Sequence, residues 1–365
     1  MVRHILLKYR FLLLLVCTGC ILLFIIFMER YLQSPTPKVN LVHLQTTYEM
    51  IGKPRTPRII IEPPCNATFL VWIVTSYAGE PSPRSALRRA YTHEELAVLG
   101  VRRVFLLGTL NDDAKRKTHM LQNSLLDEAR RFNDILQGDF LDTYRNLTRK
   151  HLMGLHWAVN NCKDVKYIVK MDDDIVVNMY GILEKLHLGV VKESSLSGYL
   201  MKNMIPVREP ANKWYVSNVE YAGSFYPDFV SGWLYVTRPQ VARQLINYAE
   251  SSHEYFWIDD VFITGILRHA LNINVQNISE IYTTDYRYLE CCIKGRVSLL
   301  KCEFLIGPNG GDVELQVRFK EFAKFCHANC SPREKSNLVG KTCVTAYKEP
   351  NPYKGAVQIS PVRIL

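Results

Sequence analysis

The stretch VKYIVKMDDDIVVN (165–178) sets three adjacent carboxylates, Asp172, Asp173 and Asp174, directly behind the apolar run Tyr167 to Val169. A run of β-branched and aromatic residues of this kind predicts a buried strand. Like charges repel one another and prefer water, so the triplet is costly at the end of such a strand unless a cation neutralises it. A solvated acidic turn is the alternative interpretation.

Strands and helices alternate upstream of the triplet. The segments 68–76 (TFLVWIVTS) and 101–108 (VRRVFLLG) predict two further buried strands. Amphipathic patterns predict helices over 82–96, 124–136 and 148–162. The order strand, helix, strand, helix, helix, strand predicts an α/β protein with a mainly parallel sheet covered on both faces. Ligands bind such sheets beyond the carboxyl ends of the strands, which is where the triplet lies.

Two of the acids are spaced to act together. Side chains repeat every two residues along a strand, so Asp172 and Asp174 are predicted to point the same way. Hard carboxylate oxygens on one side of the sheet suit Mn²⁺ or Mg²⁺ carrying a diphosphate.

The N-terminus predicts a membrane anchor. Residues 11–28 (FLLLLVCTGCILLFIIFM) are apolar apart from Thr18 and Gly19, and the basic residues before them indicate that the tail, 1–10, is cytosolic. A cleaved signal peptide is the alternative, but the run is long and no small-x-small cleavage pattern follows it. The proline-bearing residues 29–66 are predicted to be a stem, and the rest of the chain is expected on the lumenal side.

The cysteines agree with an oxidising lumen. Eight of the ten lie outside the apolar run and predict disulfides, although their pairing is open. Zinc is the alternative, but no paired C-x-x-C motif supports it. The sequons at Asn66, Asn146 and Asn277 predict N-glycosylation. The net charge of +10 arises from scattered basic residues, so no nucleic-acid partner is predicted.

In their order along the chain, these segments resemble the β-1,3-galactosyl- and N-acetylglucosaminyltransferases of glycosyltransferase family 31. Over residues 68–285 the resemblance rests on six stretches: RSALRRAY, FLLG, DFLDTYRNLTRKHLMGLHWAVNNC, VKYIVKMDDDIVVN, KWYVSNVEYAGSFYPDFVSGWLY and DDVFITG. It implies a GT-A fold over a catalytic domain, 67–285. It also implies inverting transfer from a UDP-sugar.

The resemblance also implies residue roles. Asp174 would bind the metal, with Asp172 at the ribose side of UDP and Asp173 orienting its neighbours. Asp260, preceded by Asp259, aligns with the family's catalytic aspartate and would take the proton of the acceptor hydroxyl. A helix-capping carboxylate is the alternative for Asp260. The remaining implied contacts are the nucleotide with Thr75, Ser76, Arg84 and Arg88, and the sugar or acceptor with Trp214, Tyr215, Tyr226 and Gly232.

The chain departs from the family pattern at several positions. Ala90 and Tyr91 replace a Thr-Trp pair, and Leu234 replaces a glycine. The family carries a metal-binding histidine after the catalytic aspartate. The comparable stretch here, RVSLLKCEFLIGP, has Lys301 near that position and no histidine. The cysteine-rich residues 286–365 match no pattern and are predicted to pack on the catalytic domain.

The sequence therefore predicts a single-pass type II Golgi enzyme. It would move galactose or an N-acetylhexosamine from UDP-galactose or UDP-N-acetylhexosamine, with Mn²⁺ or Mg²⁺, to a glycan of a glycoprotein or glycolipid, forming a β-1,3 linkage. Two alternatives are a catalytically silent member that binds glycans or acts like a chaperone, and a metal-dependent phosphohydrolase.

Overall fold

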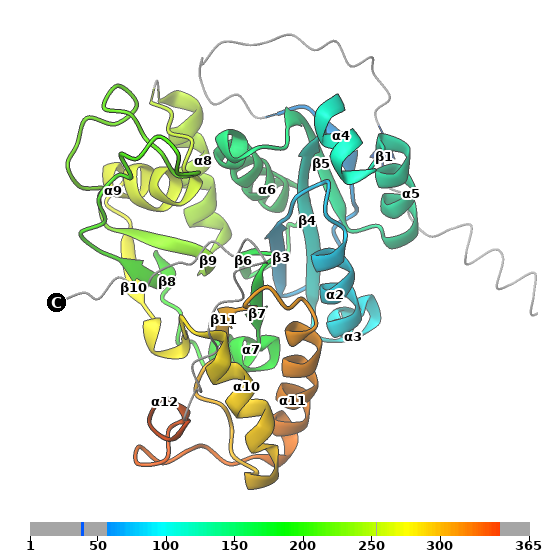
Figure 1. Cartoon of the computed structure of the whole chain (residues 1–365), viewed down its shortest axis with the longest axis vertical. Helices are drawn as coiled ribbons and strands as arrows, with labels where there is room; N and C mark the ends of the chain where they lie inside the picture. The colour runs from blue at the N-terminus through cyan, green and yellow to red at the C-terminus, as the bar shows by residue number, and fades with distance from the viewer. Residues whose placement is uncertain (1–37, 40–56, 253, 344–365) are drawn as a thin grey trace, which may run out of the picture.

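A mixed nine-stranded sheet forms the centre of the part of the chain that the structure, a computed structural model, describes: residues 38–39, 57–252 and 254–343 (Figure 1). In their order across the sheet the strands are β1 (Lys38–Val39), β2 (Ile59–Glu62), β5 (Ile135–Leu141), β4 (Val101–Thr109), β3 (Leu70–Thr75), β6 (Tyr167–Asp172), β9 (Phe229–Thr237), β8 (Ser195–Met201) and β10 (Asn274–Asn277).

Four neighbouring strands at the centre of this sheet form a parallel block, and the edge strand β10 also pairs parallel with β8. Strands β5, β4, β3 and β6 run parallel to one another, whereas β9 pairs antiparallel with both β6 and β8. The predicted α/β class with a mixed sheet is therefore confirmed. Since β3, β4 and β6 point the same way, their carboxyl ends meet at one edge of the sheet.

Helices cover both faces of the sheet. They are α2 (Ser82–Ala90), α3 (His93–Val98), α4 (Asp112–Thr118), α5 (Gln122–Phe132), α6 (Leu147–Asn161), α7 (Met179–His187), α8 (Pro239–Ser251), α9 (Arg268–Ala270), α10 (Tyr286–Lys294), α11 (Leu315–Asn329) and α12 (Val339–Thr342). Single turns η1 (Tyr144–Asn146), η3 (Ser279–Ile281) and η4 (Gly295–Ser298) and the π-helix η2 (Asp260–Leu267) complete the set.

Each central strand contributes to two cores. In β3, Val71 and Ile73 pack into the core beneath α6 and α8, while Leu70, Trp72 and Val74 pack into the core beneath α2 and α7. A strand covered on both faces buries every residue, which is why β3 reads as a continuous apolar run.

One strand of the parallel block was missed by the sequence reading. The predicted helix 124–136 is wrong at its end, because α5 stops at Phe132 and Asn133 adopts a left-handed conformation with φ 52°. Asparagine tolerates this conformation at a helix C-terminus. Ile135 and Leu136 therefore begin β5, which pairs parallel to β4.

The predicted helix 82–96 is two helices. The chain leaves α2 at Tyr91, and Thr92 begins α3 by accepting a hydrogen bond from the Glu95 amide with its side chain. Thr92 followed three residues later by Glu95 is the pattern of a capping box, which starts a helix.

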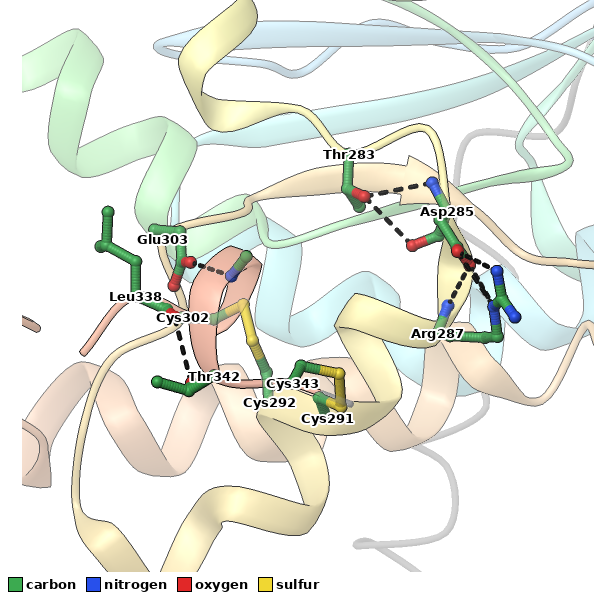
Figure 2. Close-up of a disulfide and its surroundings, with 11 residues drawn as sticks. Thr283, Asp285, Arg287, Cys291, Cys292, Cys302, Glu303, Leu338, Thr342 and Cys343 are labelled. Atoms are coloured by element: carbon green, nitrogen blue, oxygen red, sulfur yellow. Dashed lines mark hydrogen bonds and ion pairs between the residues drawn. A yellow bond between two sulfur atoms is a disulfide. The ribbon is translucent and has the colours of Figure 1, made fainter. Parts of the chain in front are cut away.

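The eight cysteines outside the predicted anchor form four disulfides. The pairs are Cys65–Cys162, Cys291–Cys343, Cys292–Cys302 and Cys326–Cys330. Figure 2 shows the adjacent Cys291 and Cys292 of α10 bonded to two different partners. The predicted disulfides are confirmed, and these thiols are not available to zinc.

The C-terminal region is joined to the acid triplet. Figure 1 shows α10, α11 and α12 grouped below the sheet. Strand β11 (Ile306–Pro308) pairs antiparallel with β7 (Ile175–Val177), which directly follows the triplet. The Asn309 amide donates to the Asp174 carbonyl at 2.9 Å. From α11, the buried Gln316 side chain bonds both the amide and the carbonyl of Val177, at 2.9 and 3.2 Å.

Replacing Gln316 is expected to weaken this junction. Gln316→Leu removes the side-chain acceptor of a buried amide and should lower the free energy of unfolding by about 1–3 kcal/mol, measured by urea denaturation. Lys324→Ala, on the exposed side of the same helix, is the control and should change stability little. Equal stability of Gln316→Leu and the wild type would contradict this role of Gln316.

Several predictions fall on residues outside the described part. The cytosolic tail, the anchor 11–28, most of the stem and residues 344–365 lie there. Among the described residues, no helix combines the length and apolar character needed to cross a bilayer.

Candidate active site

The ends of two neighbouring strands bring the predicted nucleotide residues together. Thr75, the last residue of β3, lies opposite Asp172, the last residue of β6, in a parallel register. The Asp173 amide donates to the Thr75 carbonyl at 3.1 Å, and the Ser76 hydroxyl donates to the Asp173 carboxylate at 2.6 Å. This strand end therefore holds four of the predicted positions side by side.

The three acids of the triplet have different surroundings. Asp172 forms an ion pair with Lys170 at 2.7 Å, and Asp173 is bonded to Ser76. Asp174 is exposed, and no cationic side chain of the described residues lies within ion-pair distance of it. Burial raises the pKa of Asp172 and the pKa of Asp173 to about 6. Asp174 is thus the acid most open to a cation from solution.

The strand does not extend through the triplet. β6 ends at Asp172, residues 173 and 174 form a turn, and β7 begins at Ile175. The two-residue repeat that predicted a shared direction for Asp172 and Asp174 therefore does not reach Asp174. Such a turn suits a solvated acidic loop as well as a metal ligand.

A second group of carboxylates lies at the start of η2, next to the neighbouring strand β9. Asp260, the first residue of η2, accepts a hydrogen bond from the Gly232 amide of β9 at 2.7 Å. Its other oxygen, Oδ1, is buried, has no hydrogen-bond partner among the described residues and lies 3.8 Å from Lys170 Nζ. Asp259 bonds the buried His151 of α6 at 2.9 Å. The predicted aspartate pair therefore lies beside the triplet, joined to it by Lys170.

The surroundings push the pKa values of the two aspartates apart. Burial and the neighbouring Asp259 charge raise the pKa of Asp260 well above its ordinary value. Burial acts the same way on Asp259, but Lys170 and His151 outweigh it and hold the pKa of Asp259 well below its ordinary value. With pKa values separated in this direction, Asp259 can remain an anion while Asp260 can accept a proton.

Two groups of side chains could offer ligands to a divalent cation, the triplet and this aspartate pair with His151. His151, Asp259 and Asp260 have ligand atoms close enough to share a metal. However, His151 bonds Asp259 with Nδ1 and the Tyr235 hydroxyl with Nε2, at 2.9 and 2.6 Å, and the Lys170 ammonium lies beside the acids. Asp172 is likewise paired with Lys170, at 2.7 Å, so the exposed Asp174 carboxylate is the oxygen ligand of the triplet that could meet Mn²⁺ or Mg²⁺ from solution.

The predicted arginines have partners within the protein. Arg84 is fully buried, bonds Glu128 through Nε and Nη2 at 2.8 Å each, and donates through Nη1 to the carbonyls of Tyr77 and Glu80. Arg88 bonds Glu128 and Asp134. They lie on one side of α2, as their spacing predicted, but these partners occupy the donors that were expected to meet nucleotide.

The predicted sugar and acceptor residues lie in and beside the segment before β9. The half-buried Trp214 ring stacks on Trp257 at 6.0 Å, and the exposed Tyr144 meets its edge at 5.4 Å. Tyr215 forms a bridge with Val207. Tyr226 is buried, and its hydroxyl has no hydrogen-bond partner.

Comparison with known proteins identifies the family of this chain. The sequence model of the galactosyltransferase family matches residues 82–279, more than half of the chain. The chain belongs to this galactosyltransferase family. The match spans the acid triplet, Gly232 and both aspartates.

Relatives of this galactosyltransferase-family protein carry related names. Beta-1,3-galactosyltransferase 5 of Homo sapiens is 33% identical over 251 residues, which are 65% of this chain and 74% of the relative. UDP-GlcNAc:betaGal beta-1,3-N-acetylglucosaminyltransferase 7 of Mus musculus is 37% identical over 209 residues, or 56% of this chain and 52% of the relative. The solved galactosyltransferase LgtC, in complex with donor and acceptor sugar analogues, covers 74% of this chain and 99% of its own, at 10% identity and a TM-score of 0.32.

The departures from the family pattern have structural explanations. Tyr91 is buried, donates to the Val177 carbonyl at 2.9 Å and accepts from the Met179 amide, so it ties α2 to the segment after the triplet. Leu234 lies in the core beneath α2 and α7. Lys301 pairs with Glu184 of α7 at 3.5 Å, and Asn309, which directly follows this segment, is the residue that bonds the triplet.

Sequence reasoning missed Lys170, His151 and Tyr235. Lys170 could have been predicted, because a lysine inside a predicted buried strand needs an anionic partner. No sequence pattern indicated His151 or Tyr235, because His151 is 108 residues from its partner Asp259 and 84 residues from its partner Tyr235.

Gly232 is required where backbone and carboxylate approach closely. A Cβ at this position would clash with Asp260 Oδ1 and lie 2.6 Å from Lys170 Nζ. Gly232→Ala is therefore expected to displace Asp260 and lower kcat on the order of 10- to 100-fold, measured by initial rates of sugar transfer. Gly340→Ala, where the nearest atom is Phe304 Cζ at 3.7 Å, is the control. Wild-type kcat in Gly232→Ala would contradict the role of this contact.

Proposed function

We propose that this protein is an inverting, metal-dependent transferase that moves galactose or an N-acetylhexosamine from UDP to a hydroxyl of a glycan. The proposed linkage is β-1,3, as in the names of its relatives. Of the described geometry, one observation carries the proposal. Asp260, held by the Gly232 amide, lies next to the strand end that presents Asp174, and Lys170 connects the two.

The nucleotide side of the reaction is assigned to the strand end. Asp174 and Asp172 would hold the divalent cation, while Thr75, Ser76 and Asp173 would shape the place of the uridine and ribose. When bound, Mn²⁺ or Mg²⁺ supplies electrostatic stabilisation of the leaving diphosphate. Because Arg84 and Arg88 are bonded to carboxylates, we assign them to holding α2 against α5 and β5.

The acceptor side is assigned to Asp260. Inversion by single displacement requires a base on the face of the sugar opposite the departing UDP. Asp260 accepts the proton of the acceptor hydroxyl in this proposal, and its raised pKa makes it a stronger base than an exposed aspartate. Asp259 stays ionised beside His151. The aromatic residues Trp214, Tyr215 and Tyr226 would bind the sugar and acceptor.

The cellular setting belongs to the same proposal. We assign residues 11–28 to a type II Golgi membrane anchor, residues 67–285 to the catalytic domain and residues 286–365 to the C-terminal extension. Asn66 and Asn277 are exposed and suit glycosylation, whereas the side-chain Nδ2 of Asn146, the atom that would carry the glycan, donates to the Leu141 carbonyl at 2.9 Å. No observation on the described residues favours the silent-member or phosphohydrolase alternatives.

A panel of UDP-sugars tests the proposal directly. The purified full-length chain, incubated with Mn²⁺, each UDP-sugar and arrayed glycan acceptors, should transfer galactose or an N-acetylhexosamine. Linkage analysis should find a β-1,3 product. Glycan binding with no turnover of any UDP-sugar would favour the silent-member alternative.

A further inference from the structure

We propose that Lys170 is a positioning residue that connects the donor side of the site to the catalytic base, by supplying from within the protein the cation that three carboxylates share. This inference rests on the proposed function, because it assigns the role of Lys170 in the same transfer reaction.

Lys170 lies in the middle of β6, where a lysine is unusual. Its neighbours Val169 and Met171 pack into the core beneath α2 and α7, and Ile168 packs into the other core. The side-chain alternation therefore directs Lys170 toward α6 and η2, the elements that carry His151 and the aspartate pair. Its side chain is only 1% exposed, so its charge must be neutralised within the protein.

The Lys170 ammonium meets three carboxylates, one from β6 and two from the start of η2, and a carbonyl of β9. Its Nζ lies 2.7 Å from Asp172 Oδ1, 3.6 Å from Asp259 Oδ2 and 3.8 Å from Asp260 Oδ1. It also donates to the Gly232 carbonyl at 3.0 Å. A lysine has three N–H donors, and these neighbours surround them. Among the described residues, Lys170 is the cationic side chain that lies within 4 Å of all three carboxylates.

This arrangement connects the nucleotide residue to the base through one side chain. Gly232 is bonded at both of its polar backbone groups, with its carbonyl to Lys170 and its amide to Asp260. Lys170 therefore positions Gly232, and Gly232 positions the proposed base Asp260. Lys170 also holds Asp172 at the end of β6. A change at Asp172 reaches Asp260 through Lys170.

The first test replaces the charge with an apolar group of similar length. Lys170→Met should lower kcat by about 100-fold or more, because Asp260 loses its fixed position. The affinity for UDP with Mn²⁺, measured by calorimetry, should fall by less than about tenfold, because Asp172 loses its ion pair while Asp174 is unaltered. A crystal structure of the variant should show Asp260 displaced from the Gly232 amide.

Lys320→Met is the matched control. Lys320 of α11 is also buried, with a side chain 6% exposed, and pairs with Glu95 at 2.8 Å away from the site. Its replacement should lower the melting temperature like that of Lys170 but leave kcat within about twofold of the wild type. Lys170→Arg keeps the charge at a different point, so its kcat should fall between those of the wild type and Lys170→Met.

Each outcome decides the inference. A folded Lys170→Met with kcat within about threefold of the wild type overturns it. If Lys170→Met does not fold, Lys170→Arg decides: a tenfold or larger loss of kcat with unchanged UDP affinity supports the inference, and wild-type kcat overturns it. Activity of Asp260→Asn would overturn the proposed base, whereas an inactive Asp260→Asn beside an active Lys170→Met would overturn only the role of Lys170.

Discussion

Asp260→Asn is expected to lower kcat by about 10³-fold. A general base accelerates the reaction by roughly 10²- to 10⁴-fold, and the side-chain amide of asparagine cannot accept the proton. Asparagine retains an oxygen that can accept from the Gly232 amide, now at 2.7 Å, so the local structure should remain. The measurement is the initial rate of sugar transfer at saturating UDP-sugar and acceptor.

Two further measurements separate this effect from misfolding. Calorimetry of Asp260→Asn with UDP and Mn²⁺ should give the wild-type affinity, because the substitution lies on the acceptor side. Asp285→Asn is the control, since Asp285 begins α10 outside the site and asparagine also caps helices (Figure 2). Transfer by Asp260→Asn at the wild-type rate would show that this carboxylate is a helix-terminal residue without a role as base.

Asp174→Asn is expected to abolish the dependence of UDP binding on Mn²⁺. A neutral amide is a weaker ligand for a hard cation than a carboxylate, so the affinity for UDP in Mn²⁺ should fall by about 100-fold. Calorimetry with and without Mn²⁺ measures this directly, and kcat/KM for the UDP-sugar should fall in parallel.

Asp164 provides the control for this substitution. It is exposed just before β6, at the opposite end of the strand from the triplet, so Asp164→Asn should leave both UDP affinity and transfer unchanged. If wild-type protein binds UDP equally well with and without Mn²⁺, the assignment of Asp174 as a metal ligand is wrong. Transfer would then depend on side chains alone for stabilising the diphosphate.

The main elements around the site follow from local patterns. The buried strands β3, β4 and β6 were predicted from their apolar runs, and the acids at the end of β6 from position alone. β5 was missed because its first residues continue the amphipathic pattern of α5, and only the left-handed Asn133 ends that helix. A single residue that ends a helix hardly changes an apolar pattern that is averaged over the eleven residues of α5.

The arginines show where local reasoning fails. Their four-residue spacing correctly predicted one side of a helix, but it could not reveal which groups that side meets. Glu128 and Asp134 follow 40 or more residues later and occupy the guanidinium donors. Whether a helix faces solvent, a ligand or another helix is a property of packing.

By itself, the sequence determined the class of the fold, three of the four strands of its parallel block, the oxidised state of the cysteines and the positions along the chain of the acid triplet and the aspartate pair. These features depend on short-range periodicity, on motif order and on residue chemistry. The tertiary structure alone decided the disulfide pairing, the inward direction of the arginines and the position of Lys170 among three carboxylates. Those outcomes depend on contacts between residues far apart in the chain, such as Lys170 and Gly232, whose distance only the completed sheet sets.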